Sequence, residues 1–190
     1  MTPVFGEVED VARMLEPGAP RFTTVGPGGS PQPTPAFYTT MNSRLLVFDG
    51  LEATVAGRTL APLRRLRLDF ESAAVGAEPG WEGSFAKVFE LVPGARIGGR
   101  ARPGEPVELR LDLVTDRGRR LTYRDRADAD AGGAFKFTVP YATAGAATAV
   151  RAAGPYRITA AGRAAEATVT EAEIAAGRPV AVELAAAARR

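Results

Sequence analysis

The feature that most constrains this chain is a strict alternation of apolar and polar residues, which begins at residue 84. The stretch PVELRLDLV (106–114) places Val107, Leu109, Leu111 and Leu113 at every second position. Successive side chains of a β-strand point to opposite faces, so these four share one face. A register slip of one residue would bury their charged neighbours instead. The pattern therefore predicts half-buried strands whose pairing register is well defined.

Runs of this kind continue to the end of the chain, separated by Gly, Pro or Asp. Their spacing of roughly eight to twelve residues is typical of a β-sandwich. We expect strands within SFAKVFELV (84–92), PVELRLDLV (106–114), RRLTYRDRA (119–127), GAFKFTVPY (133–141), ATAVRAAG (147–154), PYRITAAG (155–162), AEATVT (165–170) and PVAVELA (179–185). The other inward residues are Phe135, Phe137, Val139, Tyr156, Ile158, Val180, Val182 and Leu184. The outward neighbours are Glu108, Arg110, Asp112, Lys136 and Arg157.

Helical spacing replaces this alternation near the N-terminus. In GEVEDVARMLEPG (6–18), Val8, Val11, Met14 and Leu15 recur at helical intervals, and Pro17-Gly18 ends the predicted helix. The following segment VGPGGSPQPTP (25–35) contains seven Gly or Pro residues among eleven, so we expect an irregular linker there.

A second helix is predicted after this linker. Thr34 can cap it, Pro35 suits its first position, and Gly50 can supply a left-handed C-terminal cap. Four apolar residues recur on one face of it: Phe37, Met41, Leu45 and Phe48. Such a stripe is most often simply core, and it needs a surface that covers it.

The strand predicted in LRRLRLDFES (63–72) offers that surface. Its expected inner face carries Leu66, Leu68 and Phe70, and its expected outer face carries Arg65, Arg67, Asp69 and Glu71. We therefore expect an α+β, mostly β fold. A small helix-plus-sheet layer in residues 1–82 would precede an immunoglobulin-like or transthyretin-like β-sandwich in residues 83–190.

Composition excludes several kinds of chemistry. The chain has no cysteine and no histidine, which removes thiolate nucleophiles, zinc sites built from these residues and imidazole acid–base catalysis. No stretch approaches about 18 consecutive apolar residues, and the N-terminus does not resemble an export signal. The formal charge is only +2, and the arginine groups 64/65/67 and 117/119/120 lack interleaved aromatic residues, so nucleic-acid binding is not expected.

Other polar groups favour structural roles. Asp125, Asp128 and Asp130 precede a Gly-Gly turn and could form a loose calcium site, but a hairpin turn explains them better because the spacing does not fit a calcium-binding loop. The remaining candidates are the pairs Glu105/Glu108 and Glu171/Glu173, the serines Ser30, Ser43, Ser72 and Ser84, and the bases Lys87 and Lys136. None has a partner group that would suit catalysis. Asn42 is not a glycosylation acceptor, because Arg44 stands where Ser or Thr is needed. We therefore assign no catalytic, cofactor-binding or metal-binding residue.

Two family resemblances follow from these residues. DADAGGAFKFTVP and the last part of the chain resemble the transthyretin-like or carboxypeptidase-regulatory-like sandwich, whose members are generally interaction modules. The succession of FYTTMNSRLLVFDG, LRRLRLDFES and FAKVFELVPGARIGG is similar to the C-terminal end of the catalytic subunit of archaeal and related bacterial asparagine-linked oligosaccharyltransferases. The matching residues are Tyr38, Met41, Arg44, Leu45, Phe48, Asp49, Gly50, Lys87, Val88, Phe89, Val92, Pro93, Gly94 and Ala95.

The sequence also departs from that family. Its Trp-Trp-Asp motif, which engages the Ser or Thr of the acceptor, has no counterpart, because Trp81 is the only tryptophan and Glu82 follows it. The second acceptor-pocket motif and the membrane part with its acidic loops have no match either. The resemblance thus implies a C-terminal soluble segment that is inactive alone and supports the acceptor-binding core.

The resemblance also implies an activity, a location and partners for the parent enzyme. The parent would transfer glycan from a polyprenyl-phosphate-linked donor to an acceptor asparagine at the extracytoplasmic face of a membrane. Mg or Mn would sit in its membrane part, and the segment would hold no cofactor. Its partners would be the rest of the parent, the acceptor protein and the lipid-linked oligosaccharide, without nucleic acid. The alternative is a stand-alone sandwich that binds a protein or a carbohydrate.

Overall fold

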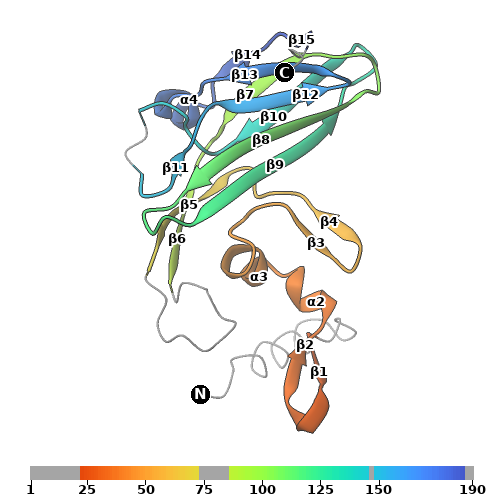
Figure 1. Ribbon diagram of the computed structural model, residues 1–190, viewed down its shortest axis with the longest axis vertical. Helices are drawn as coiled ribbons and strands as arrows, with labels where there is room; N and C mark the ends of the chain where they lie inside the picture. The colour runs from red at the N-terminus through yellow and green to blue at the C-terminus, as the bar shows by residue number, and fades with distance from the viewer. Residues whose placement is uncertain (1–21, 73–85, 146–147, 187–190) are drawn as a thin grey trace. The chain divides into compact units, whose positions relative to one another are not determined.

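A computed structural model of the chain describes residues 22–72, 86–145 and 148–186 (Figure 1). The predicted helix in 6–18, Trp81 and Ser84 lie outside these residues. Contacts divide the chain into a first unit, Met1–Asp49 with Ala53–Leu60, and a second unit, Gly50–Glu52 with Ala61–Arg190. The division at residue 82 expected from the sequence remains a proposal, although backbone pairing between 66–71 and 87–91 spans it.

The first unit is built from short elements. A hairpin of β1 (Thr23–Val25) and β2 (Pro31–Pro33) encloses the 3-10 turn η1 (Pro27–Gly29), and β3 (Ala53–Val55) pairs with β4 (Arg58–Leu60). The expectation of an irregular linker in 25–35 is therefore wrong. The prolines and glycines lie at the turn and in a strand that pairs on one side only, where they are tolerated.

The predicted second helix is broken into two. α2 (Pro35–Tyr38) ends before Thr39, and α3 (Met41–Leu46) begins after Thr40. The Thr40 hydroxyl accepts a hydrogen bond from the Ser43 backbone N–H at 3.2 Å and donates to the Phe37 carbonyl at 2.7 Å. Threonine thus caps α3 internally, because its side chain offers the backbone an alternative to continuous helix. Thr34 makes no side-chain cap hydrogen bond, contrary to expectation.

The expected C-terminal cap at Gly50 is wrong, because α3 already ends at Leu46 and its C-cap, Val47, has a right-handed helical conformation. Gly50 and Asp49 have positive φ values in the turn that follows the helix. Phe37, Leu45 and Phe48 are half-buried, whereas Met41 is exposed.

The second unit is a β-sandwich, as predicted. Its larger sheet holds β8 (Pro106–Val114), β9 (Arg120–Asp128), β11 (Arg151–Ala152), β12 (Tyr156–Ala160), β13 (Arg163–Ala167) and β15 (Ala185–Ala186). Its smaller sheet has the order β10 (Ala134–Val139), β7 (Ala95–Arg100) and β14 (Pro179–Ala181), with β14 parallel to β7. Helix α4 (Glu171–Ala176) precedes β14, and β5 (Leu66–Glu71) pairs with β6 (Lys87–Leu91).

The buried residues confirm the inward faces that the alternation predicts. Val107, Leu109, Leu111 and Leu113 of β8 are each at most 1% exposed. The other buried members of the predicted inward set are Phe135, Phe137, Val139, Tyr156 and Ile158. Val180, Val182 and Leu184 are partly buried against the same core, and the predicted outward residues are exposed. Both sheets contribute to this one apolar cluster.

The faces of β5 differ from those expected. Leu68 is buried as predicted, but Phe70 is exposed, and Arg67 and Glu71 are buried. The register shifts between Leu68 and Phe70, so that Leu68 lies opposite Phe89 and Phe70 lies opposite Val88. Neighbouring residues of β6 point to opposite faces, so this bulge places Leu68 and Phe70 on opposite faces.

Helix α4 was not predicted, whereas a hairpin turn at Asp130 was. Helix α4 begins with a capping box, in which Thr170 and Glu173 satisfy each other's backbone N–H groups. Asp130 holds a turn by accepting hydrogen bonds from the N–H groups of Gly132 and Ala134, at 2.9 and 2.8 Å. That turn passes from β9 in the larger sheet to β10 in the smaller one and is therefore not a hairpin within one sheet.

Candidate functional site

A buried ion cluster joins the β5–β6 pair to helix α4 within the second unit. Arg67 is 4% exposed, and its guanidinium donates to Glu90 at 2.6 and 2.9 Å and to Glu171 at 2.6 and 3.1 Å. It also lies 3.5 Å from the Pro140 carbonyl. Burial disfavours the charged form, but the hydrogen bonds to Glu171 and Glu90 outweigh it and raise the pKa of Arg67. We call Arg67, Glu90 and Glu171 the arginine clamp.

Further ion pairs connect β5 and its preceding loop to the larger sheet. The buried Glu71 carboxylate accepts from Arg119, just before β9. Arg64 donates through Nε and Nη2 to the buried Asp125 on β9, at 2.7 and 2.9 Å. This hydrogen bond from the Arg64 guanidinium to Asp125 raises the pKa of Arg64. Removing either partner of such an ion pair leaves the other charge buried without compensation and destabilises the fold.

Hydrogen bonds of two tyrosine hydroxyls also hold β5 within the second unit. The Tyr141 hydroxyl accepts a hydrogen bond from the Leu68 backbone N–H at 3.0 Å. The Tyr156 hydroxyl donates to the Tyr141 carbonyl at 2.8 Å and accepts from the Tyr141 N–H at 3.2 Å. Burial raises the pKa of Tyr156 well above its usual value, so this hydroxyl stays a neutral donor. Strand β5 is thus anchored by both charge and neutral hydrogen bonds.

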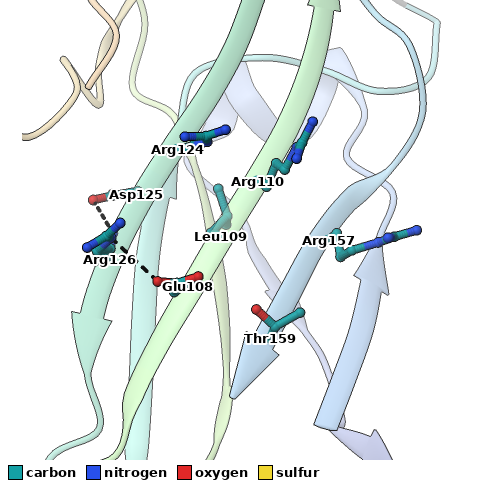
Figure 2. A pocket seen from close by; sticks show the side chains of 8 residues that line it. All are labelled: Glu108, Leu109, Arg110, Arg124, Asp125, Arg126, Arg157 and Thr159. Carbon is teal, nitrogen blue, oxygen red and sulfur yellow. Dashed lines mark hydrogen bonds and ion pairs between the residues drawn. The ribbon is translucent and has the colours of Figure 1, made fainter. Parts of the chain in front are cut away.

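A hollow of about 270 Å³ with both polar and apolar lining lies on the outer face of the larger sheet (Figure 2). It is lined by Glu108, Leu109, Arg110, Arg124, Asp125, Arg126, Arg157 and Thr159. Register places Arg110 on β8 directly opposite Arg124 on β9 and also opposite Arg157 on β12. Three guanidinium groups therefore come from one row across three strands.

Carboxylates at the margin balance part of this charge. Arg110 donates to Asp112 through Nε and Nη2, at 3.1 and 2.9 Å, and Thr122 donates to the same carboxylate at 2.9 Å. Desolvation opposes ionisation of Asp112, but the hydrogen bonds from Arg110 and Thr122 outweigh it and lower its pKa. Arg126 lies 3.6 Å from Glu108.

The residues considered for calcium do not come together as one ligand set. Asp125 is buried and paired with Arg64, Asp128 is exposed at the end of β9, and Asp130 holds its turn. Within 22–72, 86–145 and 148–186, no group of three or more Asp and Glu residues is arranged to hold a metal ion.

The acidic pairs noted in the sequence separate into different roles. Glu105 accepts from the Arg102 N–H at 2.8 Å and also pairs with Arg163, and the backbone hydrogen bond is the main cause of its lowered pKa. Glu171 belongs to the arginine clamp. Glu173 serves the capping box, and the hydrogen bond from the Thr170 N–H lowers its pKa. Ser43 and Ser72 hydrogen-bond to nearby backbone groups, and Lys87 and Lys136 lie on strands of different sheets.

No helix in the described part of the chain is long and apolar enough to span a membrane.

Comparison with known proteins finds relatives of the sandwich. A sequence model of the family described as "Archaeal glycosylation protein B long peripheral domain" matches residues 94–180. The chain is 37% identical over 102 residues to the dolichyl-monophosphooligosaccharide–protein glycotransferase AglB of Haloferax volcanii. This alignment covers 46% of the chain and 9% of that relative.

Solved structures share the fold. The crystal structure of the Archaeoglobus fulgidus oligosaccharyltransferase with zinc and sulfate superposes with a TM-score of 0.71 at 16% identity, over 93% of this chain and 32% of that one. The AglB oligosaccharyltransferase of the same organism, in complex with an inhibitory peptide and a dolichol-phosphate, gives a TM-score of 0.66 at 16% identity, over 84% of this chain and 26% of that one.

The chain therefore spans less than a tenth of the curated relative and about a third or less of these structures. The mostly β, α+β fold and the resemblance to the C-terminal soluble region of archaeal oligosaccharyltransferases are confirmed. Residues 94–180 are similar to the archaeal glycosylation protein B long peripheral domain.

Proposed function

We propose that this chain is a non-catalytic C-terminal soluble part of an oligosaccharyltransferase catalytic subunit, and that it supports the acceptor-binding core. The family match of 94–180 and the 37% identity to AglB of Haloferax volcanii support this origin. The parent would transfer a glycan from a polyprenyl-phosphate-linked donor to asparagine in protein N-glycosylation. The complex of the Archaeoglobus fulgidus enzyme with a peptide and a dolichol-phosphate supports such partners for the parent.

The observation that carries a supporting role is the surface of α3. Met41, Leu46 and Val47 are 53%, 46% and 50% exposed. Met41 and Leu46 lie on α3 and Val47 is its C-cap, whereas Asn42, Ser43 and Arg44 on the same helix are polar. Large apolar side chains that gather on an exposed surface are typical of an interaction site. We infer that the rest of the parent covers α3.

The second unit supplies the rigidity that a support needs. Its ion pairs and tyrosine hydrogen bonds join β5 and its preceding loop to the larger sheet, to Tyr141 and to α4. Removing one partner of such a pair leaves an uncompensated charge, so the arrangement is held in one geometry. A rigid support can hold the peptide-binding core in a fixed position relative to the reacting groups. Small displacements of that core lower the reaction rate strongly.

The chemistry itself is assigned to parts that this sequence does not match. The only tryptophan is followed by Glu82, so the acceptor-binding Trp-Trp-Asp motif is not in this chain. We infer that residues 1–82 form the edge of the parent's central core and 83–190 its peripheral domain. The divalent ion would lie in the membrane part, and the domain would face the extracytoplasmic side.

The test uses the full-length parent that contains this chain. A Met41→Ser, Val47→Ser double variant should lower glycan transfer to a peptide with an Asn-X-Thr sequon by about tenfold, because the core loses its apolar support. The matched control is Val25→Ser, which changes an exposed valine of β1 and should leave transfer unchanged.

Two results would contradict the proposal. One is equal transfer by the double variant and the control at equal protein level. The other is glycan transfer by the isolated chain when it is supplied with donor and peptide. An isolated chain that instead bound a protein or a sugar by itself would favour a stand-alone sandwich module.

A further inference from the structure

The outer face of the larger sheet concentrates arginine in an unusual way. Cross-strand partners in an antiparallel sheet lie close together, and like charges directly opposite each other are unfavourable. Arg110 nevertheless lies opposite an arginine on each side, Arg124 and Arg157. We call these three residues the arginine row. Figure 2 shows their side chains fanning apart from three neighbouring strands.

The carboxylates around the row leave much of this charge unmatched. Asp112 engages Nε and Nη2 of Arg110, which leaves Nη1 available. Glu166 lies 3.6 Å from Arg157, beyond ordinary hydrogen-bond distance. In the described part of the chain, Arg124 has no carboxylate within ion-pair distance. Guanidinium N–H groups without a hydrogen-bonded carboxylate are therefore available among the residues that line the hollow, which also include Glu108 and Asp125.

The hollow limits what these groups can hold. A volume of about 270 Å³ is at the lower end of the range for small-molecule sites. No aromatic ring lines it, so it offers no stacking surface for a nucleobase. Thr159 adds a neutral hydroxyl at its margin. Guanidinium groups match carboxylate, phosphate and sulfate oxygens because they donate two parallel hydrogen bonds.

We propose that the arginine row binds an oxyanion, a carboxylate, phosphate or sulfate, carried by a small soluble ligand. The anion sits between Arg124, Arg110 and Arg157 and relieves their mutual repulsion. Arg110, oriented by Asp112, donates from its remaining nitrogen, and the flexible side chains of Arg124 and Arg157 close over the anion. This site lies apart from the arginine clamp, and it does not depend on the function proposed above.

The experiment titrates the isotope-labelled chain with inorganic phosphate, sulfate, glucuronate and, as an uncharged control, glucose. Amide signals of β8, β9 and β12 should shift saturably with the anions and not with glucose, and rising sodium chloride should weaken binding. Arg124→Gln should weaken it about tenfold, as expected for one lost charge-assisted contact. In the described part of the chain Arg124 forms no ion pair, so the fold should persist in Arg124→Gln. Arg58→Gln, on β4 of the first unit, removes the same charge elsewhere and should not change affinity.

Several outcomes would overturn the proposal. These are the absence of saturable shifts with all three anions, shifts confined to other surfaces, and equal weakening by Arg124→Gln and Arg58→Gln. A separate arm adds vesicles containing phosphatidylglycerol. Binding to these vesicles without binding to the soluble anions would indicate a lipid headgroup surface and contradict a soluble ligand.

Discussion

Replacing Arg67 with methionine tests whether the arginine clamp stabilises the second unit. Methionine keeps most of the unbranched apolar stem but removes the guanidinium, so the change isolates the loss of charge and hydrogen bonds. Glu90 and Glu171 then lose their shared partner. We expect the chain to fold and to be less stable.

The magnitude follows from the exposure of the three side chains. Breaking a fully buried ion pair costs about 3–5 kcal/mol, whereas exposed pairs contribute about 0–1 kcal/mol. Arg67 is buried, but the side chains of Glu90 and Glu171 are 49% and 38% exposed and can regain water. We therefore expect a loss of about 2–3 kcal/mol, or about 5–10 °C in Tm for a domain of this size.

The measurement is urea unfolding followed through amide signals of the second unit, so that the first unit does not contribute. Arg110→Met is the matched control, because Arg110 also pairs with a carboxylate but both side chains are 53% exposed. Arg110→Met should lower the free energy of unfolding by less than about 1 kcal/mol. The double variant Arg67→Met, Glu171→Gln should lose less free energy of unfolding than the sum of the losses in the two single variants. Equal losses for Arg67→Met and Arg110→Met would refute a stabilising clamp.

Three other changes probe separate features. Tyr156→Phe removes two hydrogen bonds to the Tyr141 backbone and should cost about 2 kcal/mol in urea unfolding, and an unchanged midpoint would exclude their importance. Gly94→Ala should lower the free energy of unfolding by about 2 kcal/mol, because φ is +77° and the new Cβ would lie 2.8 Å from a Thr138 methyl group. Gly57→Ala is the control for backbone strain alone, because its φ is similar but its surroundings are open, and it should lower the free energy of unfolding by less. Glu173 has a lowered pKa, so its stabilising effect should be present above about pH 4.3, its unfolded value, and disappear as the pH falls through the folded value. The stability difference between wild type and Glu173→Gln should therefore shrink in acid, and a difference that is constant with pH would contradict this.

The sandwich could be predicted because its signal is local and repeated. Along β8, each apolar residue alternates with a charged or polar one, so the sequence alone assigns its two faces. β7 was harder to predict, because ARIGGR shows little alternation and Gly98 and Gly99 have no side chains to report a face. Its partners, β10 and β14, are distant in sequence.

The arginine clamp could not be predicted, because it depends on tertiary partners that are distant in the sequence. The alternation in 63–72 indicates that Arg67 is outward, yet it lies buried against Glu171, which is more than one hundred residues away. The break between α2 and α3 has a weak local signal, since two adjacent threonines, Thr39 and Thr40, can cap as well as continue a helix. The arginine row is visible only once the register joins β9, β8 and β12.

The size and location of the native polypeptide decide whether this chain acts as part of a larger membrane enzyme. An antibody raised against the second unit would be used to probe membrane and soluble fractions of the source cells. The proposed function predicts a band far above 19.9 kDa, the mass of this chain, in the membrane fraction. A band at 19.9 kDa, confined to the soluble fraction, would contradict it.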